Sequence, residues 1–278
     1  MEEQLTYHQK IEALNQRRLE RGYQSHQNGI KSVGKVIEKF LSQVEVSDSD
    51  PEPPKPKRSR KERALLVKVR FMHEVEKLIT GEDPFQVTED NQKILRELVN
   101  YFTGDLDFIT SGLIENSASF KKGIALIGPP GVGKSLILRA FSKALKVSEP
   151  EYPEEMAAFA FKSSTQICEE IDSTREKSEL FNDYGRRITA KGSGGMMLNH
   201  LCIDDLGKEE IERAYQYGRN PIKIIINDRW DRLRHGARFH FTSNLNLDGL
   251  EAVYNPAIVD RLRDMCNIIQ VGGESFRK

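Results

Sequence analysis

The pattern of apolar and polar positions changes once along the chain. Within residues 1–46, apolar side chains recur at roughly helical spacing among Gln, Glu and Arg, with glycines between them. Too few apolar residues are present there for a large core, so we expect a small helical region that docks on a partner. Residues 64–79 and 91–102 show clearer amphipathic helices, and the turn sequence Gly81-Glu-Asp-Pro84 separates them.

Beyond these helices, short apolar runs alternate with helical segments. Five runs of strand length lie at 124–127, 159–161, 201–203, 239–242 and 268–271. Strands that alternate with helices form parallel sheets with helices on both faces. We therefore expect an α/β fold with a five-stranded parallel sheet between helices, in a domain at residues 64–278 whose core begins at about residue 90.

A linker separates the N-terminal region from this domain. Residues 47–63 are rich in proline and charged side chains, which restrict the backbone and resist burial. The basic run across residues 55–70 is open to two interpretations. It is either a nucleic-acid contact or a solvated linker that enters a polar helix.

Composition narrows the class of protein. The chain has 42 basic and 42 acidic residues, so its net charge indicates no particular partner. No apolar run is long enough to span a bilayer and the first residues do not resemble a signal peptide, so we expect a cytoplasmic protein with no membrane partner. Three widely separated cysteines predict buried thiols rather than a metal site or disulfides, namely Cys168, Cys202 and Cys266.

The first chemical motif follows the first predicted strand. Residues 128–135, Gly-Pro-Pro-Gly-Val-Gly-Lys-Ser, match the pattern G-x-x-x-x-G-K-S/T between a strand and a helix. In such a loop, backbone N–H groups and the helix N-terminus face phosphate oxygens. We expect Lys134 to meet the β- and γ-phosphates and Ser135 to bind Mg²⁺. The predicted nucleotide-binding residues are Gly128, Pro129, Pro130, Gly131, Val132, Gly133, Lys134, Ser135 and Leu136.

A pair of carboxylates follows the third predicted strand. Asp204 and Asp205 come directly after the apolar run 201–203, at the strand end where parallel sheets bind ligands. We expect Asp204 to hold Mg²⁺ and Asp205 to orient the attacking water. Asp205 is one methylene shorter than the glutamate of many P-loop relatives, so Glu209 or Glu210 is an alternative source of assistance.

Two further groups complete the predicted site. Asn244 follows the fourth predicted strand, where its amide can hydrogen-bond the γ-phosphate and the attacking water, or else cap a helix. Arg261 and Arg263 lie in a predicted short helix. From there a positive group would stabilise transition-state charge on a neighbouring subunit's ATP, unless the helix is a surface helix with Asp–Arg pairs.

These motifs together resemble the DnaC-like and DnaI-like helicase loaders and the IstB-like transposition ATPases of the AAA+ superfamily. The resemblance runs from about residue 90 to the last residue. It rests on the P-loop, Ile-Asp-Asp-Leu-Gly at 203–207, Thr-Ser-Asn-Leu-Asn at 242–246, Asp-Arg-Leu-Arg at 260–263 and Gly-Glu-Ser-Phe-Arg at 273–277. It implies an AAA+ P-loop NTPase core that uses ATP and Mg²⁺ and has no C-terminal lid.

The resemblance also implies roles for single residues. Asn244 would be the first sensor, and Arg277 would approximate the second. Arg261 would be the arginine finger that acts on the adjacent subunit, which implies self-association. The segment 220–235 reads as a helix with a basic side, which faces DNA, the next subunit or solvent. The candidate contacts on it are Lys223, Arg229 and Arg232.

Three functions stay open on the sequence. The first is a DNA replication factor that loads a DnaB-like replicative helicase, held by residues 1–46, with ATP hydrolysis in an oligomer on single-stranded DNA. The second is an IstB-like accessory ATPase that assembles on duplex DNA and directs a transposase. The third is an ATP-binding switch or scaffold with little turnover, which the short Asp205 side chain keeps open.

Overall fold

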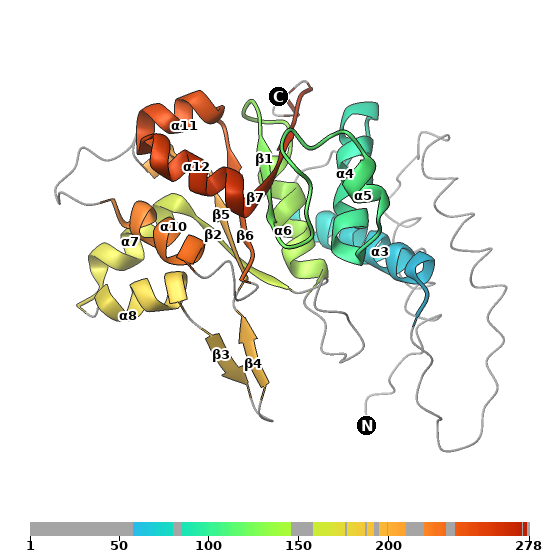
Figure 1. Cartoon of the computed structure of the whole chain (residues 1–278). Coiled ribbons are helices and arrows are strands. Elements are labelled where there is room, and N and C mark those ends of the chain that lie inside the picture. The colour runs from blue at the N-terminus through green and yellow to red at the C-terminus, as the bar shows by residue number, and fades with distance from the viewer. Residues whose placement is uncertain are drawn as a thin grey trace, which may run out of the picture. The chain divides into compact units, whose positions relative to one another are not determined.

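The computed structural model describes most of the predicted catalytic domain (Figure 1). The predicted N-terminal region and the first part of the linker, at residues 1–57, lie outside the described residues. Among the helices of the described part, none is long and apolar enough to cross a membrane. The described residues are 58–79, 85–145, 158–175, 177–186, 188–191, 195–198, 200–209, 220–231, 237–273 and 275–276.

A five-stranded sheet forms the centre of the domain, in the order β2-β5-β6-β1-β7. Every neighbouring pair in it is parallel, which confirms the predicted architecture. The last strand starts at Cys266 rather than at residue 268. The apolar pattern missed this start because Asn267 is polar, although it is fully buried within the strand. The strands are β1 (Gly123–Ile127), β2 (Phe159–Ser163), β5 (His200–Asp204), β6 (Phe239–Ser243) and β7 (Cys266–Gln270).

Helices cover both faces of the sheet (Figure 1). One layer contains α3 (Arg60–Leu78), α4 (Glu89–Thr103), α5 (Asp107–Thr110) and α6 (Lys134–Ala144). The other contains α7 (Ser164–Ser173), α10 (Pro221–Asp231), α11 (Leu247–Tyr254) and α12 (Pro256–Met265). The elements that follow α7 were not predicted from the sequence. They are a short helix, α8 (Lys177–Phe181), a π-helical turn (Asn182–Arg186), and an antiparallel hairpin of β3 (Ile188–Lys191) and β4 (Gly195–Leu198).

Alternating residues of the central strands face opposite helical layers. In β1, Ile124 and Leu126 pack with α3, α4 and α6, whereas Ala125 and Ile127 pack with the other layer. A strand covered on both faces is therefore apolar throughout, as the sequence pattern indicated. The three cysteines are buried free thiols, as predicted.

Capping residues explain where the first two helices begin. The Ser59 hydroxyl accepts a hydrogen bond from Glu62 N, and the Glu62 carboxylate accepts one from Ser59 N, so α3 begins at Arg60. Apolar periodicity placed this start at residue 64, because the first turn of α3 is basic and polar. Thr88 and Asn91 form the equivalent pair before α4.

Candidate nucleotide-binding site

The predicted phosphate loop joins the end of β1 to the start of α6. Gly133 precedes the helix with a φ of 89°, and Gly131 has a φ of 88°, both in the left-handed region that favours glycine. Within the described residues no side chain caps the start of α6. The first N–H groups of this helix are therefore available to an anion at its N-terminus.

Lys134 is folded back over this loop. Its Nζ donates hydrogen bonds to Gly128 O at 2.7 Å, to Pro129 O at 2.6 Å and to Asn244 Oδ1 at 2.8 Å. The residue is only 4% exposed, and a buried ammonium needs such oxygen partners. Phosphate oxygens are acceptors of the same kind and carry more negative charge. The loop therefore holds a cation where a phosphate chain would lie.

Asp204 and Ser135 meet at the carboxyl end of β5. The Asp204 carboxylate accepts a hydrogen bond from Thr242 Oγ1 at 2.5 Å, and the Ser135 hydroxyl lies near enough to lower the pKa of Asp204. Burial raises the pKa of Asp204, although the hydroxyls of Thr242 and Ser135 oppose this. A hydroxyl and a carboxylate side by side fit Mg²⁺, which binds few protein ligands and completes its shell with phosphate and water. The described residues contain no group of three or more acidic, His and Cys side chains that could hold a metal ion.

Asp205 follows in a sharp turn with a φ of 54°, which is uncommon for a residue other than glycine. Its N–H donates to Thr242 Oγ1 at 2.9 Å, and its carbonyl accepts from Ser164 Oγ at 2.9 Å. Its side chain accepts a hydrogen bond from Asn244 Nδ2 at 3.3 Å. Asn244 thus contacts both Asp205 and Lys134, so the fold brings these three predicted residues together.

Glu209 holds the same turn from inside the protein. Its carboxylate accepts hydrogen bonds from Gly207 N at 3.0 Å and from the Tyr254 hydroxyl, and the residue is 2% exposed. Burial raises the pKa of both Glu209 and Tyr254. The alternative in which Glu209 assists the attacking water is therefore wrong, because protein groups engage this carboxylate. Glu210 lies outside the described residues.

The last described residues lie on the phosphate loop, a contact that the sequence did not predict. Phe276 N donates a hydrogen bond to Gly131 O at 3.1 Å. A Cβ added to Gly131 would lie 2.1 Å from Ser275 Oγ, so the close approach requires glycine. Arg277, the predicted second sensor, comes next in the chain but lies outside the described residues.

Arg261 lies on α12 and contacts α10. Its Nη1 donates a hydrogen bond to Asn227 Oδ1, and its guanidinium carbon lies 5.0 Å from the ring centroid of Trp230. Within the described residues none of its hydrogen bonds reaches the phosphate loop. Arg263 instead pairs with Asp260 of its own helix at 3.1 Å. The two arginines of Asp-Arg-Leu-Arg therefore have different surroundings.

The three candidate contacts of the predicted basic helix, which is α10 in the structure, have different surroundings. Arg229 is 2% exposed, and its Nε donates a hydrogen bond to Tyr184 O at 2.6 Å. The predicted DNA contact is wrong for Arg229, because its guanidinium is buried between α10 and the π-helical turn. Lys223 is half-buried, with its ammonium 5.7 Å from the Tyr254 ring centroid, and its DNA contact stays a prediction. Arg232 lies outside the described residues.

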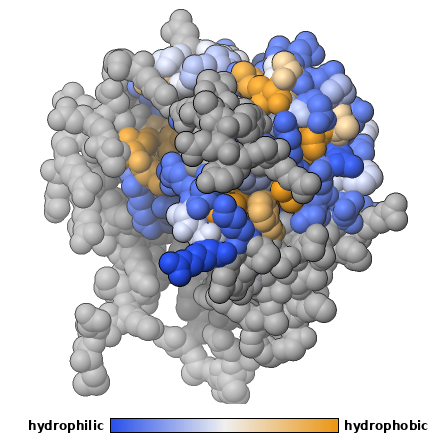
Figure 2. Space-filling model, turned by 90° about the vertical axis from the view of Figure 1, so that its left-hand side faces the viewer, coloured by the Kyte–Doolittle hydropathy of each residue, from blue (hydrophilic) through white to orange (hydrophobic). Residues whose placement is uncertain are grey.

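Figure 2 views the side of the molecule that carries α7, α8 and α10 on the left of Figure 1. The described surface there is mostly hydrophilic, with separate hydrophobic patches. In the described part, the exposed large hydrophobic side chains include Trp230, which is 37% exposed. An exposed aromatic side chain beside an arginine is typical of protein interfaces.

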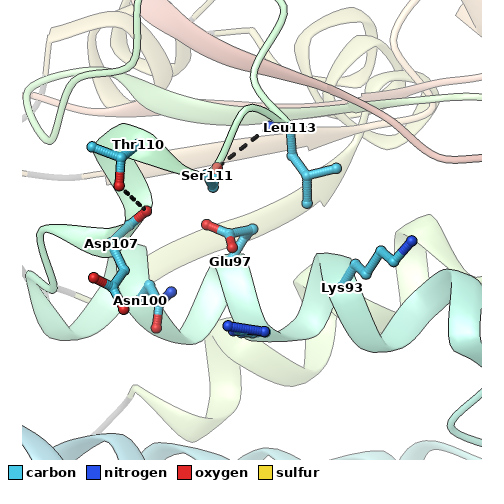
Figure 3. Close-up of a pocket in the computed structure, with 8 residues that line it drawn as sticks. Lys93, Glu97, Asn100, Asp107, Thr110, Ser111 and Leu113 are labelled. Carbon is cyan, nitrogen blue, oxygen red and sulfur yellow. Dashed lines mark hydrogen bonds between the residues drawn. The ribbon is translucent and has the colours of Figure 1, made fainter.

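A separate cavity of about 500 Å³ lies between α4 and the segment that follows it (Figure 3). Glu97 points from α4 toward Ser111 across this cavity, and burial raises the pKa of Glu97. The cavity contains none of the predicted site residues. It is lined by Lys93, Arg96, Glu97, Asn100, Asp107, Thr110, Ser111 and Leu113.

Comparisons with solved structures give distant likenesses. The chain is similar to DnaI, at 19% identity and a TM-score of 0.45, over 70% of this chain and 88% of that one. It is similar to the DnaC helicase loader, at 16% identity and a TM-score of 0.43, over 69% of this chain and 95% of that one. A third likeness is to AMPPCP-bound DnaA from Aquifex aeolicus, at 17% identity and a TM-score of 0.42, over 68% and 49% of the two chains.

Comparison of sequences identifies the family. No curated protein matches the chain. Residues 110–278 match the model of a family described as IstB-like ATP binding protein. This match contains the phosphate loop, Asp204, Asp205, Asn244 and Arg261, and it extends over more than half of the chain. The chain therefore belongs to the family of IstB-like ATP-binding proteins.

Proposed function

We propose that this protein binds ATP with Mg²⁺ in the phosphate loop and hydrolyses it in assemblies of several copies. The observation that carries the proposal is the double contact of Asn244, which hydrogen-bonds Lys134 Nζ and Asp205 Oδ1. In a P-loop ATPase these positions serve the γ-phosphate and the attacking water. The Asn244 amide lies between these two positions, as expected of a side chain that contacts the γ-phosphate and aligns the attacking water.

Each remaining residue has a chemical role in this proposal. Lys134 would neutralise charge on the β- and γ-phosphates, and Asp205 would orient the water. Ser135 and Asp204 would hold Mg²⁺, which bridges phosphate oxygens and neutralises developing charge when it is bound. The proximity of Ser135 to Asp204 supports this pairing, because two ligands of one cation must lie side by side.

Hydrolysis would need a second copy of the chain. Arg261 would act on the ATP of the neighbouring copy, where a guanidinium stabilises the transition-state charge. Its hydrogen bond to Asn227 on α10 supports this role. Within the described residues, the Arg261 side chain makes no hydrogen bond to the phosphate loop of its own copy. Arg263 is a weaker candidate, since its partner Asp260 is a carboxylate that offsets its charge, whereas the partner of Arg261 is a neutral amide.

For the biological process, we propose a replication factor that loads a DnaB-like helicase on single-stranded DNA. The support is the set of motifs around residues 203–207, 242–246 and 273–277, which resembles the loaders of this group. Residues 1–46 would dock on the helicase, separated by the linker at 47–63 from the ATPase domain at 64–278. The sequence of residues 1–46 supports a docking role, because it holds too little apolar material for a core of its own.

A transposition accessory ATPase on duplex DNA is the second candidate. The description of the matching family favours it, because that description refers to IstB-like proteins. The two candidates share the same ATP chemistry and differ in the nucleic acid and the partner protein. A nucleotide-operated switch with little turnover would differ from both in its rate of hydrolysis.

The discriminating experiment measures ATP hydrolysis by the full chain alone, with single-stranded DNA, with duplex DNA and with a DnaB-like helicase. The loader predicts stimulation by single strands together with a stable complex with the helicase. Stimulation by duplex alone would instead favour the transposition role. ATP binding without turnover in all four conditions would contradict hydrolysis and leave the switch. The Lys134→Ala protein controls for contaminating ATPases.

A further inference from the structure

Arg261 is held by two side chains that α10 presents to α12. Asn227 accepts a hydrogen bond from its Nη1, and the Trp230 ring lies against the guanidinium, 5.0 Å from its carbon to the ring centroid. Asn227 and Trp230 are three residues apart in a helix, so both project from the same face. Asn227 thus fixes the position of one guanidinium N–H group, and the Trp230 ring fixes the orientation of the guanidinium plane.

The indole is itself held in place. Trp230 Nε1 donates a hydrogen bond to Asp264 Oδ2 at 3.3 Å, and Asp264 follows Arg261 by three residues on α12. Two adjacent pairs therefore link the helices, Arg261 with Asn227 and Asp264 with Trp230. Such a double link restricts rotation of the indole, and a restricted indole restricts the guanidinium that lies on it. Packing of α10 with α12 in one core gives the arrangement a rigid base.

We propose that Trp230 and Asn227 are positioning residues that orient Arg261 toward the ATP of a neighbouring copy. This inference rests on the proposed function, in which Arg261 acts between copies. A free arginine side chain has many rotamers, so the two contacts lower the entropy lost when it reaches a phosphate.

Exposure supports a docked copy on this face. Trp230 keeps 37% of its surface exposed although it is the one tryptophan of the chain, and Arg261 is half-buried. Tryptophan and arginine are the residues most enriched at the centres of protein interfaces. The neighbouring copy contributes an anionic partner, because bound ATP carries several negative charges that complement a guanidinium. The charge of bound ATP on a second copy of this chain therefore complements the guanidinium on this face.

The first test compares two substitutions of Trp230. Trp230→Leu removes the ring, whereas Trp230→Phe keeps an aromatic face for the guanidinium. Trp230→Leu should lower the hydrolysis of the assembled protein by roughly tenfold to a hundredfold, since misplacing a catalytic group by about 1 Å costs about a hundredfold. Trp230→Phe should retain most of the rate. Equal losses in the two variants would overturn the role of the ring.

A second test mixes two variants to show whether the defect of Trp230→Leu lies in the action of Arg261 on a neighbouring copy. Asp205→Asn protein has a disabled ATP site but keeps Trp230 and Arg261, so it should restore hydrolysis at the intact ATP sites of Trp230→Leu. The rate of a mixture at constant total protein should pass through a maximum as the Asp205→Asn fraction rises. A monotonic decline would overturn the inference, because damage to the ATP site of the Trp230→Leu copy cannot be restored by a neighbour.

Two further controls distinguish this inference from the function on which it rests. If Arg261→Ala hydrolyses ATP as the unaltered chain does, the proposed action between copies fails. If Arg261→Ala loses hydrolysis but Trp230→Leu and Asn227→Ala do not, only the positioning role fails. Fluorescence of the single tryptophan gives an independent readout: Arg261→Ala should shift the emission of the free protein, and unchanged emission would overturn the stacked arrangement.

Discussion

Asn244 Oδ1 accepts a hydrogen bond from Lys134 Nζ at 2.8 Å, while the same amide donates through Nδ2 to Asp205 Oδ1 at 3.3 Å. The link depends on both ends of the amide, one as acceptor and one as donor. It places the loop lysine and the acidic strand end in one hydrogen-bonded chain. A γ-phosphate that binds Lys134 would therefore change the hydrogen bond between Asn244 and Asp205, because Asn244 contacts both Lys134 and Asp205.

Replacing Asn244 with alanine should uncouple binding from hydrolysis. We expect ATP affinity to change only a few-fold, because the loop amides and Lys134 remain. The rate of hydrolysis should fall by about a hundredfold, comparable to the loss of one donor in other sites that stabilise transition-state charge. Isothermal titration and steady-state hydrolysis on the same sample test this. A comparable loss in both quantities would contradict the proposed role.

Lys134→Ala should weaken ATP binding itself. The lysine is the charged partner that the loop holds among three oxygen atoms, and a hydrogen bond to a charged group contributes about 1.5–3 kcal/mol, so we expect a loss of about 10- to 100-fold in affinity. Lys143→Ala, in the last turn of the same helix and exposed, is the matched control. If both variants bound ATP like the unaltered chain, the phosphate site would be misassigned.

Arg261→Ala should bind ATP normally yet lose assembly-dependent hydrolysis. The matched change is Arg263→Ala, which removes an arginine from the same helix that pairs only with Asp260 among the described residues. Exposed pairs of this type contribute little to stability, so this control should fold and hydrolyse ATP. Mixing Arg261→Ala with Asp205→Asn should restore activity, since each copy lacks what the other retains. Absence of restoration would argue against action between copies.

Acid should destabilise the domain through His200. This histidine is buried, its Nδ1 accepts a hydrogen bond from Arg238 N at 2.8 Å, and burial together with Arg238 and Arg229 lowers its pKa to about 4. The unfolded chain has a histidine pKa of about 6.5 and so binds the extra proton first. The free energy of unfolding should therefore fall as pH drops from about 6.5 to 4, by roughly 3 kcal/mol from this group, and stay level above pH 7.

Urea unfolding at pH 7, 6 and 5 measures this dependence. His200→Asn keeps an acceptor near the Nδ1 position but cannot take up a proton. The variant should lose less stability between pH 7 and 5 than the unaltered chain does. Burial lowers the pKa of His240 in the same direction, so some pH dependence should persist in the variant. Equal losses in the two proteins would show that His200 does not contribute.

The fold and the phosphate loop could be predicted because their signals are local. The loop motif lies between a strand and a helix within residues 123–144, and β1 is apolar at all five positions. Asp204 and Asp205 were found in the same way, at the end of an apolar run. The parallel topology then brought Asn244 to them, because adjacent strands of a parallel sheet end at one edge.

The remaining features depend on contacts between distant segments. Arg229 was expected on a basic surface, but α10 packs that side against the π-helical turn, and sequence periodicity does not show which face of a helix is covered. The buried bond between Glu209 and Tyr254 joins residues 45 positions apart. Likewise, Ser275 meets Gly131 only because β7 lies beside β1. No local pattern in the sequence carries this information.

The central claim is an ATP site completed by a neighbouring copy. Its most direct test is the rate of ATP hydrolysis per copy, measured over a range of protein concentrations with Mg²⁺ and single-stranded DNA, beside Lys134→Ala. The account predicts a rate per copy that rises with concentration until assembly is complete, and a far lower rate for the variant at every concentration. A rate per copy that is independent of concentration, or equal in the two proteins, would contradict it.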